Sequence, residues 1–126
     1  YLGEQERDLV SRIIGLPPDQ LTSKLKLEFS RITLTDNSFN ERLTIDTNLS
    51  AKNGISSKIF DQLVISEIKQ KKYDTKSDFI QILRGLKIQE MRFSKYCMGV
   101  LHLNDNVKYN RFKPKLLQIN KILTQV

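Results

Sequence analysis

The sequence describes a small, basic protein. Its 126 residues suffice for one hydrophobic core but not for two, so we expect a single domain over residues 1–126. Hydrophobic residues make up 39% and charged residues 28% of the chain, which excludes a disordered protein. The single cysteine, Cys97, excludes an intramolecular disulfide and a cysteine-rich zinc site. The formal net charge of +7 favours a polyanionic partner: a nucleic acid, an anionic lipid surface or a phosphate-rich small molecule.

The sequence shows no targeting signal. No apolar run approaches the roughly 20 residues that span a bilayer, and no signal-peptide pattern opens the chain. We therefore expect no membrane segment in this chain and a cytoplasmic protein. The chain starts at Tyr1 without a methionine and enters a helical pattern at once, so we expect it to be a piece of a longer protein.

The first predicted element is a helix over Leu2–Ile14. Its apolar residues recur at helical spacing, and Gly15 followed by Pro17 and Pro18 ends it. A short helical turn is expected to begin at Asp19, and the sheet is expected to follow this turn.

Alternating side chains then predict three β-strands, which cover Lys24–Thr35, Phe39–Asn48 and Gln62–Gln70. The turn cluster Asp36–Ser38 joins the first two strands into a hairpin, and residues 50–57 are expected to form a loop. We expect the three strands to belong to one antiparallel sheet.

Charged residues share particular faces of these strands, because successive side chains of a strand point to opposite sides. Arg42 and Asp46 share one face of the second strand, and Glu67 and Lys69 share one face of the third. Arg31 falls on the otherwise apolar face of the first strand, where a bare charge is costly unless it enters a lined cavity. Such charges can simply be solvated, or they can line a polar concavity that holds an anion and its metal. For Asp46 we expect a salt bridge to Arg42 in preference to a metal contact.

Three helices are predicted in the second half of the chain. Ser77 and Asp78 cap the first of them, and the second carries its apolar spacing over Phe93–Leu101. Pro114 fits the first turn of the closing helix. The predicted fold class is therefore α+β, with an antiparallel sheet that carries charge on one face and with flanking and C-terminal helices.

The charged strand residues suit phosphate chemistry. Arginine donates two parallel hydrogen bonds to a phosphate, and lysine acts as a movable point charge. Magnesium and manganese are typically held by one or two carboxylates together with phosphate oxygens. Arg31, Arg42 and Lys69 are therefore candidate phosphate-binding residues. Glu67 is the candidate ligand of a divalent metal, Mn or Mg, that neutralises charge during phosphoryl transfer.

Four segments of the chain resemble the VTC domain in their order and spacing. This is the catalytic-type domain of the vacuolar transporter chaperone polyphosphate polymerases and their bacterial relatives, within the CYTH-like triphosphate tunnel metalloenzymes. The segments are Phe29–Leu34, Glu41–Asp46, Ser66–Lys69 and Ser94–Cys97. The resemblance extends over nearly the whole chain.

The resemblance implies an antiparallel β-barrel whose basic tunnel holds a polyphosphate chain. The family's phosphate contacts map to Arg31, Arg42, Lys69, Ser94 and Lys95, and its metal ligand maps to Glu67. Ser94 and Lys95 would lie near one mouth of the tunnel. We expect the basic side chains of this set to point into one concavity.

The early strands of the family are not found in this chain. The resemblance therefore implies that the chain is the C-terminal portion of a VTC-like tunnel domain. Three strands cannot close an eight-stranded tunnel, so we expect weak or no catalysis from this portion alone. Its open sheet edge could pair with a second copy and form a homodimer.

The leading functional hypothesis is a polyphosphate polymerase-like domain that transfers phosphoryl groups from a nucleoside triphosphate to a polyphosphate chain. One alternative is a non-catalytic module that binds polyphosphate or inositol phosphates. A nucleic-acid-binding domain is the least favoured alternative, because it would require an open basic face and an affinity that falls steeply with salt.

Overall fold

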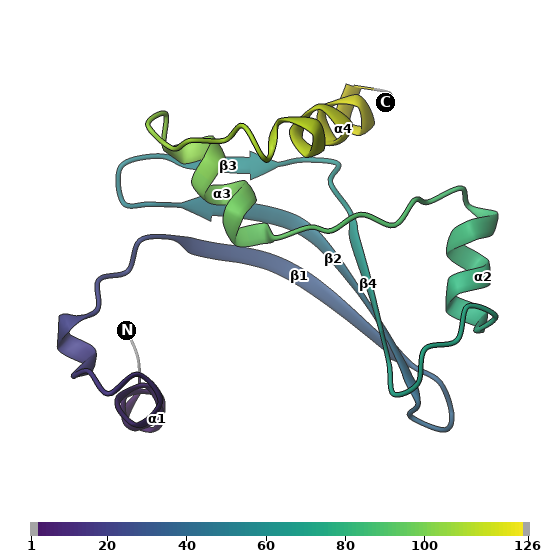
Figure 1. Ribbon diagram of the computed structural model, residues 1–126, viewed down its shortest axis with the longest axis horizontal. Helices are drawn as coiled ribbons and strands as arrows, with labels where there is room; N and C mark the ends of the chain where they lie inside the picture. The colour runs from purple at the N-terminus through teal and green to yellow at the C-terminus, as the bar shows by residue number, and fades with distance from the viewer. Residues whose placement is uncertain (1–2, 125–126) are drawn as a thin grey trace.

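The computed structural model describes residues 3–124, so the Leu2 end of the predicted first helix lies outside the described residues. In chain order the elements are α1 (Glu4–Ile14), the 3₁₀ turn η1 (Pro18–Gln20), β1 (Lys26–Thr35), β2 (Glu41–Lys52), β3 (Ser57–Phe60), β4 (Ile65–Gln70), α2 (Asp78–Gly85), α3 (Lys95–Leu103) and α4 (Lys113–Thr124) (Figure 1). Helices beside an antiparallel sheet confirm the predicted α+β class.

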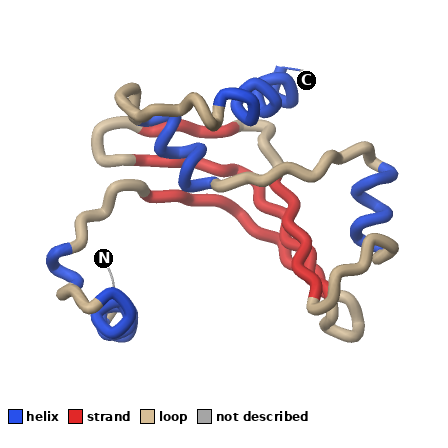
Figure 2. Tube along the Cα trace, viewed as in Figure 1, coloured by secondary structure: helices blue, strands red, loops and turns tan. Residues whose placement is uncertain are grey.

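β2 is the central strand of the sheet, and every other strand pairs with it. β1 runs antiparallel to it along one side. On the other side β4 pairs with residues 41–46 and β3 pairs with residues 49–52, both antiparallel. Over residues 3–124 the sheet is therefore open and is not closed into a barrel (Figure 2). Closure into a tunnel stays a prediction.

The predicted end of the second strand at Asn48 is wrong, because β2 continues to Lys52. β3, which was not predicted, begins at the last residue of the predicted loop. Asn48 takes a φ of +55° and, together with Leu49, lies opposite the single β1 residue Phe29. This is a β-bulge, which inserts one extra residue and shifts the alternation of side chains by one. The shifted pattern looks like the end of a strand although the strand continues.

The bulge brings apolar and charged residues to one face of the sheet. Asp46 lies opposite Arg31, and Ala51 lies opposite Leu27. Arg31 and Leu27 point to the same side of β1, and directly opposite residues of antiparallel strands also share a side. Asp46 and Ala51 therefore lie on one face, which is charged toward β4 and apolar toward β3.

The hydrophobic core covers the apolar half of this face. Its buried members are Leu49, Ala51, Phe60, Leu63, Met98 and Ile119. Met98 comes from α3 and Ile119 from α4, and both helices lie over the β3 end of the sheet (Figure 1). Gly99 allows α3 to approach this closely, because a Cβ atom there would lie 2.9 Å from Leu25 Cδ2 and 3.0 Å from Ala51 Cβ.

α1 and α2 lie away from this core, at opposite ends of the molecule (Figure 1). Ser77 caps α2 as predicted, since its hydroxyl accepts a hydrogen bond from the Ile80 N–H at 3.4 Å. The same hydroxyl donates to Glu41 Oε1 at 2.6 Å and thereby ties α2 to β2. Pro114 lies in the first turn of α4, also as predicted. No helix within residues 3–124 is long and apolar enough to cross a membrane.

We expect Leu49→Ala to lower the free energy of unfolding by about 2–5 kcal/mol, the range for truncating a buried leucine. Leu49 is 0% exposed, so its removal leaves a cavity between the sheet and the helices. Urea unfolding followed by circular dichroism measures the loss. Ile55→Ala is the control: Ile55 is 96% exposed, so the change should stay within about 0.5 kcal/mol. Equal losses in the two variants would contradict this core.

Candidate functional site

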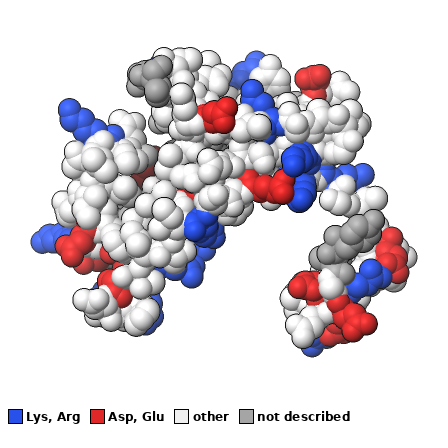
Figure 3. Space-filling view, turned by 180° about the vertical axis from the view of Figure 1, so that it is seen from behind, with Lys and Arg blue, Asp and Glu red and all other residues white. Residues whose placement is uncertain are grey.

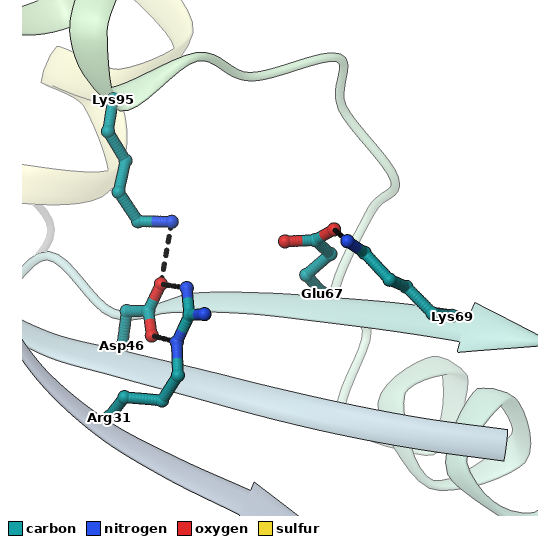
Figure 4. A network of polar contacts seen from close by, with 5 residues as sticks. All are labelled: Arg31, Asp46, Glu67, Lys69 and Lys95. Carbon is teal, nitrogen blue, oxygen red and sulfur yellow. Dashed lines mark hydrogen bonds and ion pairs between the residues drawn. The ribbon is translucent and has the colours of Figure 1, made fainter. Parts of the chain in front are cut away.

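The charged half of the sheet face collects residues from three strands and a helix. Arg42 of β2 lies directly opposite Lys69 of β4. Arg31 of β1 lies directly opposite Asp46 of β2. Because Arg42 and Asp46 have the same parity in β2, all these side chains point to one side of the sheet. Lys95, the first residue of α3, reaches the same side from above (Figure 4).

Asp46 is the centre of an ion cluster on this face. Arg31 donates from Nε to Asp46 Oδ1 at 2.6 Å and from Nη2 to Oδ2 at 2.8 Å. Lys95 Nζ lies 2.6 Å from the same Oδ2 atom. The side chain of Asp46 is 1% exposed, that of Lys95 17% and that of Arg31 41%. The expected salt bridge from Asp46 to Arg42 is wrong, because the hairpin register puts Arg31 opposite Asp46.

The ring of Phe29 forms a wall of this Asp46 cluster. Arg31 Cζ and Lys95 Nζ each lie 5.1 Å from the centroid of the ring. Cations at this distance are attracted to the electron-rich face of an aromatic ring. Both cations are therefore held by a carboxylate and by the same aromatic side chain.

The cluster keeps Asp46 ionised. Hydrogen bonds from Arg31 lower the pKa of Asp46 from 3.8 to about 2, and Lys95 adds to this effect while burial opposes it. The hydrogen bonds to Asp46 also raise the pKa of Arg31. At neutral pH the cluster therefore holds two positive charges around one negative charge and remains attractive to anions.

A hollow of about 350 Å³ lies at the end of the sheet where the turn joins β1 to β2, and it is called the outer hollow below. Its lining includes Arg42, Lys69 and Lys71. Arg42 and Lys69 are direct cross-strand neighbours, an unfavourable arrangement for like charges that a bound anion would relieve. Lys69 Nζ lies 3.2 Å from Glu67 Oε1. Arg42 has no ion-pair partner among residues 3–124.

The predicted single basic concavity is thus divided into two parts. Arg42 and Lys69 line the outer hollow. Arg31 and Lys95 belong to the Asp46 cluster further along the face. The four side chains share one side of the sheet without sharing one cavity.

The VTC domain family model matches residues 5–104, a range that holds every residue of the hollow and of the Asp46 cluster. The chain belongs to the VTC domain family. No curated protein and no solved structure matches it. The match ends just after α3, so α4 lies outside the part of this VTC chain that the family describes.

Glu67 is the metal ligand that the VTC resemblance implies. Its side chain is about half exposed and pairs with Lys69. Within residues 3–124, no group of three His, Cys, Asp or Glu side chains is placed to hold a metal ion. The other carboxylate of the face, Asp46, is already bound by two cations. The described residues therefore fit a divalent metal only as one shared between Glu67 and the oxygens of a bound phosphate.

Ser94 caps the helix that carries Lys95. Its side-chain oxygen accepts a hydrogen bond from the Cys97 N–H at 3.3 Å. This cap fixes the start of α3 and with it the position of Lys95. The hydroxyl proton is not used in that bond, and the phosphate contact of Ser94 stays a prediction.

Sequence reasoning missed the pairing of Asp46 with Arg31, although the hairpin turn held a signal for it. The Asp36 carboxylate accepts a hydrogen bond from the Glu41 N–H at 2.8 Å and closes the turn between β1 and β2. Counting outward from the centre of that turn places Arg31 opposite Asp46. No such local signal exists for the contact between Asp46 and Lys95, the first residue of α3.

We expect the VTC chain to lose stability as the pH falls from about 4 to about 2, because the pKa of Asp46 lies near 3.8 in the unfolded chain and at about 2 in the folded one. In this range the unfolded state binds a proton that the folded state does not. The stabilisation is complete above roughly pH 5 and is lost as the pH falls through the folded pKa. Urea unfolding between pH 7 and pH 2 measures this loss.

Asp46→Asn should lower the free energy of unfolding at pH 7 by about 1.5–3 kcal/mol, the contribution of hydrogen bonds to a charged group. The same change should also reduce the loss of stability that occurs as the pH falls from about 4 to about 2. The control is Glu28→Gln, because the pKa of Glu28 is likewise lowered to about 2 by Lys52 and Lys26 but its ion pairs are exposed. An acid profile of Asp46→Asn that matches the wild type would contradict the assigned role of this cluster in stability.

Proposed function

We propose that this VTC domain binds polyphosphate and a nucleoside triphosphate along its charged face and transfers phosphoryl groups from the nucleotide to the polyphosphate chain. The opposed pair Arg42 and Lys69, which line one hollow together with Lys71, is the observation that carries the proposal. Three cations line one hollow, and within residues 3–124 only Lys69 among them has an ion-pair partner; this arrangement favours a multiply charged anion.

The spacing of the cations favours an elongated ligand. Arg42 and Asp46 are four residues apart on β2, which corresponds to roughly 13 Å along a strand. One phosphate group cannot contact both the outer hollow and the Asp46 cluster, whereas a chain of phosphates can. A linear polyphosphate therefore suits this face better than a single phosphate.

The residues of the hollow also suit phosphoryl transfer, which depends mostly on positioning and electrostatics. The planar guanidinium of Arg42 can donate two parallel hydrogen bonds to one phosphate. Lys69 can turn from Glu67 toward the ligand, since the pair is exposed and therefore weak. A divalent ion, Mn or Mg, held by Glu67 and phosphate oxygens would neutralise charge on the transferred group.

A non-catalytic module that binds polyphosphate or inositol phosphates is the second candidate. The pairing of Glu67 with Lys69 favours it, because the carboxylate is already compensated and the hollow can attract anions without a metal. A nucleic-acid-binding domain has less support. On the face shown in Figure 3, cationic side chains are dispersed among acidic ones and do not form one continuous basic surface.

The exposed edge of β1 is the place where further strands could attach and enclose the charged face. Within residues 3–124 this ten-residue strand pairs with β2 alone. We propose that further strands of a complete tunnel domain, or a second copy of the chain, cover that edge. Enclosure would lower the local dielectric constant and strengthen the contacts between the cations and phosphate.

We expect Arg42→Ala to weaken binding of tripolyphosphate by about tenfold or more, because a charge-assisted hydrogen bond contributes about 1.5–3 kcal/mol. Lys72→Ala is the matched control: Lys72 is exposed and does not line the hollow, so its removal should cost little. Isothermal titration calorimetry on the full-length protein measures both affinities. Similar losses in the two variants would count against a specific site.

We expect Glu67→Gln to separate an enzyme from a binder. In an enzyme it should abolish metal-dependent turnover, because the metal loses its carboxylate ligand. Polyphosphate binding without metal should stay intact or tighten, because the site loses a negative charge. In a binder it should spare or strengthen binding, with no turnover to lose. The measurements are polyphosphate formation from ATP with Mn and affinity with a chelator. Glu28→Gln, on the opposite face of β1, should leave turnover unchanged, and unchanged turnover in Glu67→Gln would remove Glu67 from the mechanism.

A further inference from the structure

We propose that Asp46 is a positioning residue of the anion site: it fixes Arg31 and Lys95 so that their unused donors face a bound phosphate chain. This inference rests on the proposed function. It assigns to a carboxylate inside a basic site a role that favours anion binding, the opposite of what its charge alone would do.

The geometry of the hydrogen bonds is the first part of the argument. Asp46 occupies Nε and Nη2 of Arg31, and the third guanidinium nitrogen points away from Asp46, toward the side where Glu67 lies (Figure 4). The ammonium group of Lys95 has three donors, and its ion pair with Asp46 leaves donors free. Donors from β1 and from α3 thus remain available on the same side of the sheet.

The order of burial is the second part. Asp46 is 1% exposed, whereas Lys95 is 17% and Arg31 41% exposed. The carboxylate therefore lies beneath the two cations, and a ligand that approaches from solvent meets the cations first. Phosphate oxygens are kept from the buried negative charge while they contact the groups that it holds.

Repulsion between the two cations is the third part. Arg31 Nη2 and Lys95 Nζ lie 2.8 Å and 2.6 Å from the same Asp46 Oδ2 atom, so the two cations are close to each other. Like charges at such a separation repel each other unless a counter-charge lies between them. Without the carboxylate of Asp46, the two side chains would separate and lose their common direction.

The test compares two variants that each remove one negative charge from a carboxylate bridging two cations. Asp46→Asn changes the buried bridge, and Glu28→Gln changes the exposed bridge between Lys26 and Lys52 on the opposite face of β1. Affinity for tripolyphosphate is measured by calorimetry in chelator with the full-length protein. Simple electrostatics predicts that both changes tighten binding. Positioning predicts that Asp46→Asn weakens it by about tenfold or more, the loss for one misaligned charge-assisted hydrogen bond.

A second comparison shows whether Asp46 acts through the two cations. In a chain that already carries Arg31→Met and Lys95→Met, Asp46→Asn should cause no further loss of affinity. A merely structural role would continue to cost affinity in that background and would overturn the proposal. Circular dichroism verifies that each variant is folded.

The wild-type chain provides a test that no folding defect can obscure. The Arg31 Nε–H resonance should remain protected from solvent exchange when tripolyphosphate binds, because Asp46 keeps that bond. Loss of this protection would overturn the proposal, as would unchanged or tighter binding by Asp46→Asn. If Arg42→Ala weakens binding and Asp46→Asn does not, the positioning role alone fails. A wild type that binds no tripolyphosphate overturns both this inference and the proposed function.

Discussion

The pairing of β1 with β2, interrupted by the bulge at Asn48, is the constraint on which the rest of the structure depends. Before the bulge it sets Arg31 against Asp46, and after the bulge it sets Leu27 against Ala51. One extra residue lets a single strand serve a charged site and a hydrophobic core on the same side of the sheet. Without it, the residues after the bulge would point to the other face, and α3 and α4 would lie over a surface with no matching core.

The charged face has a rigid part and an adjustable part. Arg31 and Lys95 are held by a buried carboxylate and an aromatic ring. Lys69 pairs with Glu67 in solvent, where an ion pair contributes little and exchanges partners easily. A ligand can therefore recruit the outer cations at small cost and meet the inner ones already aligned. This difference in how firmly the cations are held would orient a chain-like anion along β2 as well as attract it.

Local patterns were sufficient to predict the α+β class, the hairpin and the common face of Arg42 and Lys69. Helical spacing decides the helices, a turn cluster decides the hairpin, and parity within short strands decides the common face. Alternation failed for residues 49–52 of β2, because the bulge at Asn48 shifts parity by one residue and imitates a strand end. It also missed β3, whose four residues are too few for an alternation to be distinctive. The contact between Lys95 and Asp46 joins a helix to a strand far away in sequence. No periodicity encodes such a contact, and only the family resemblance placed Lys95 at the site.

Gly99 connects the core to the charged site through the body of α3. The helix lies so close to Leu25 and Ala51 that a Cβ atom at position 99 would press on both. One turn earlier, the same helix presents Lys95 to the carboxylate of Asp46. The helix therefore acts as a rigid spacer whose height above the strands is set by the thickness of the packing beneath it. Under the proposed function, side-chain volume in the core would become a determinant of anion affinity, and selection for binding would extend to Gly99, which lies in the core and not at the charged site.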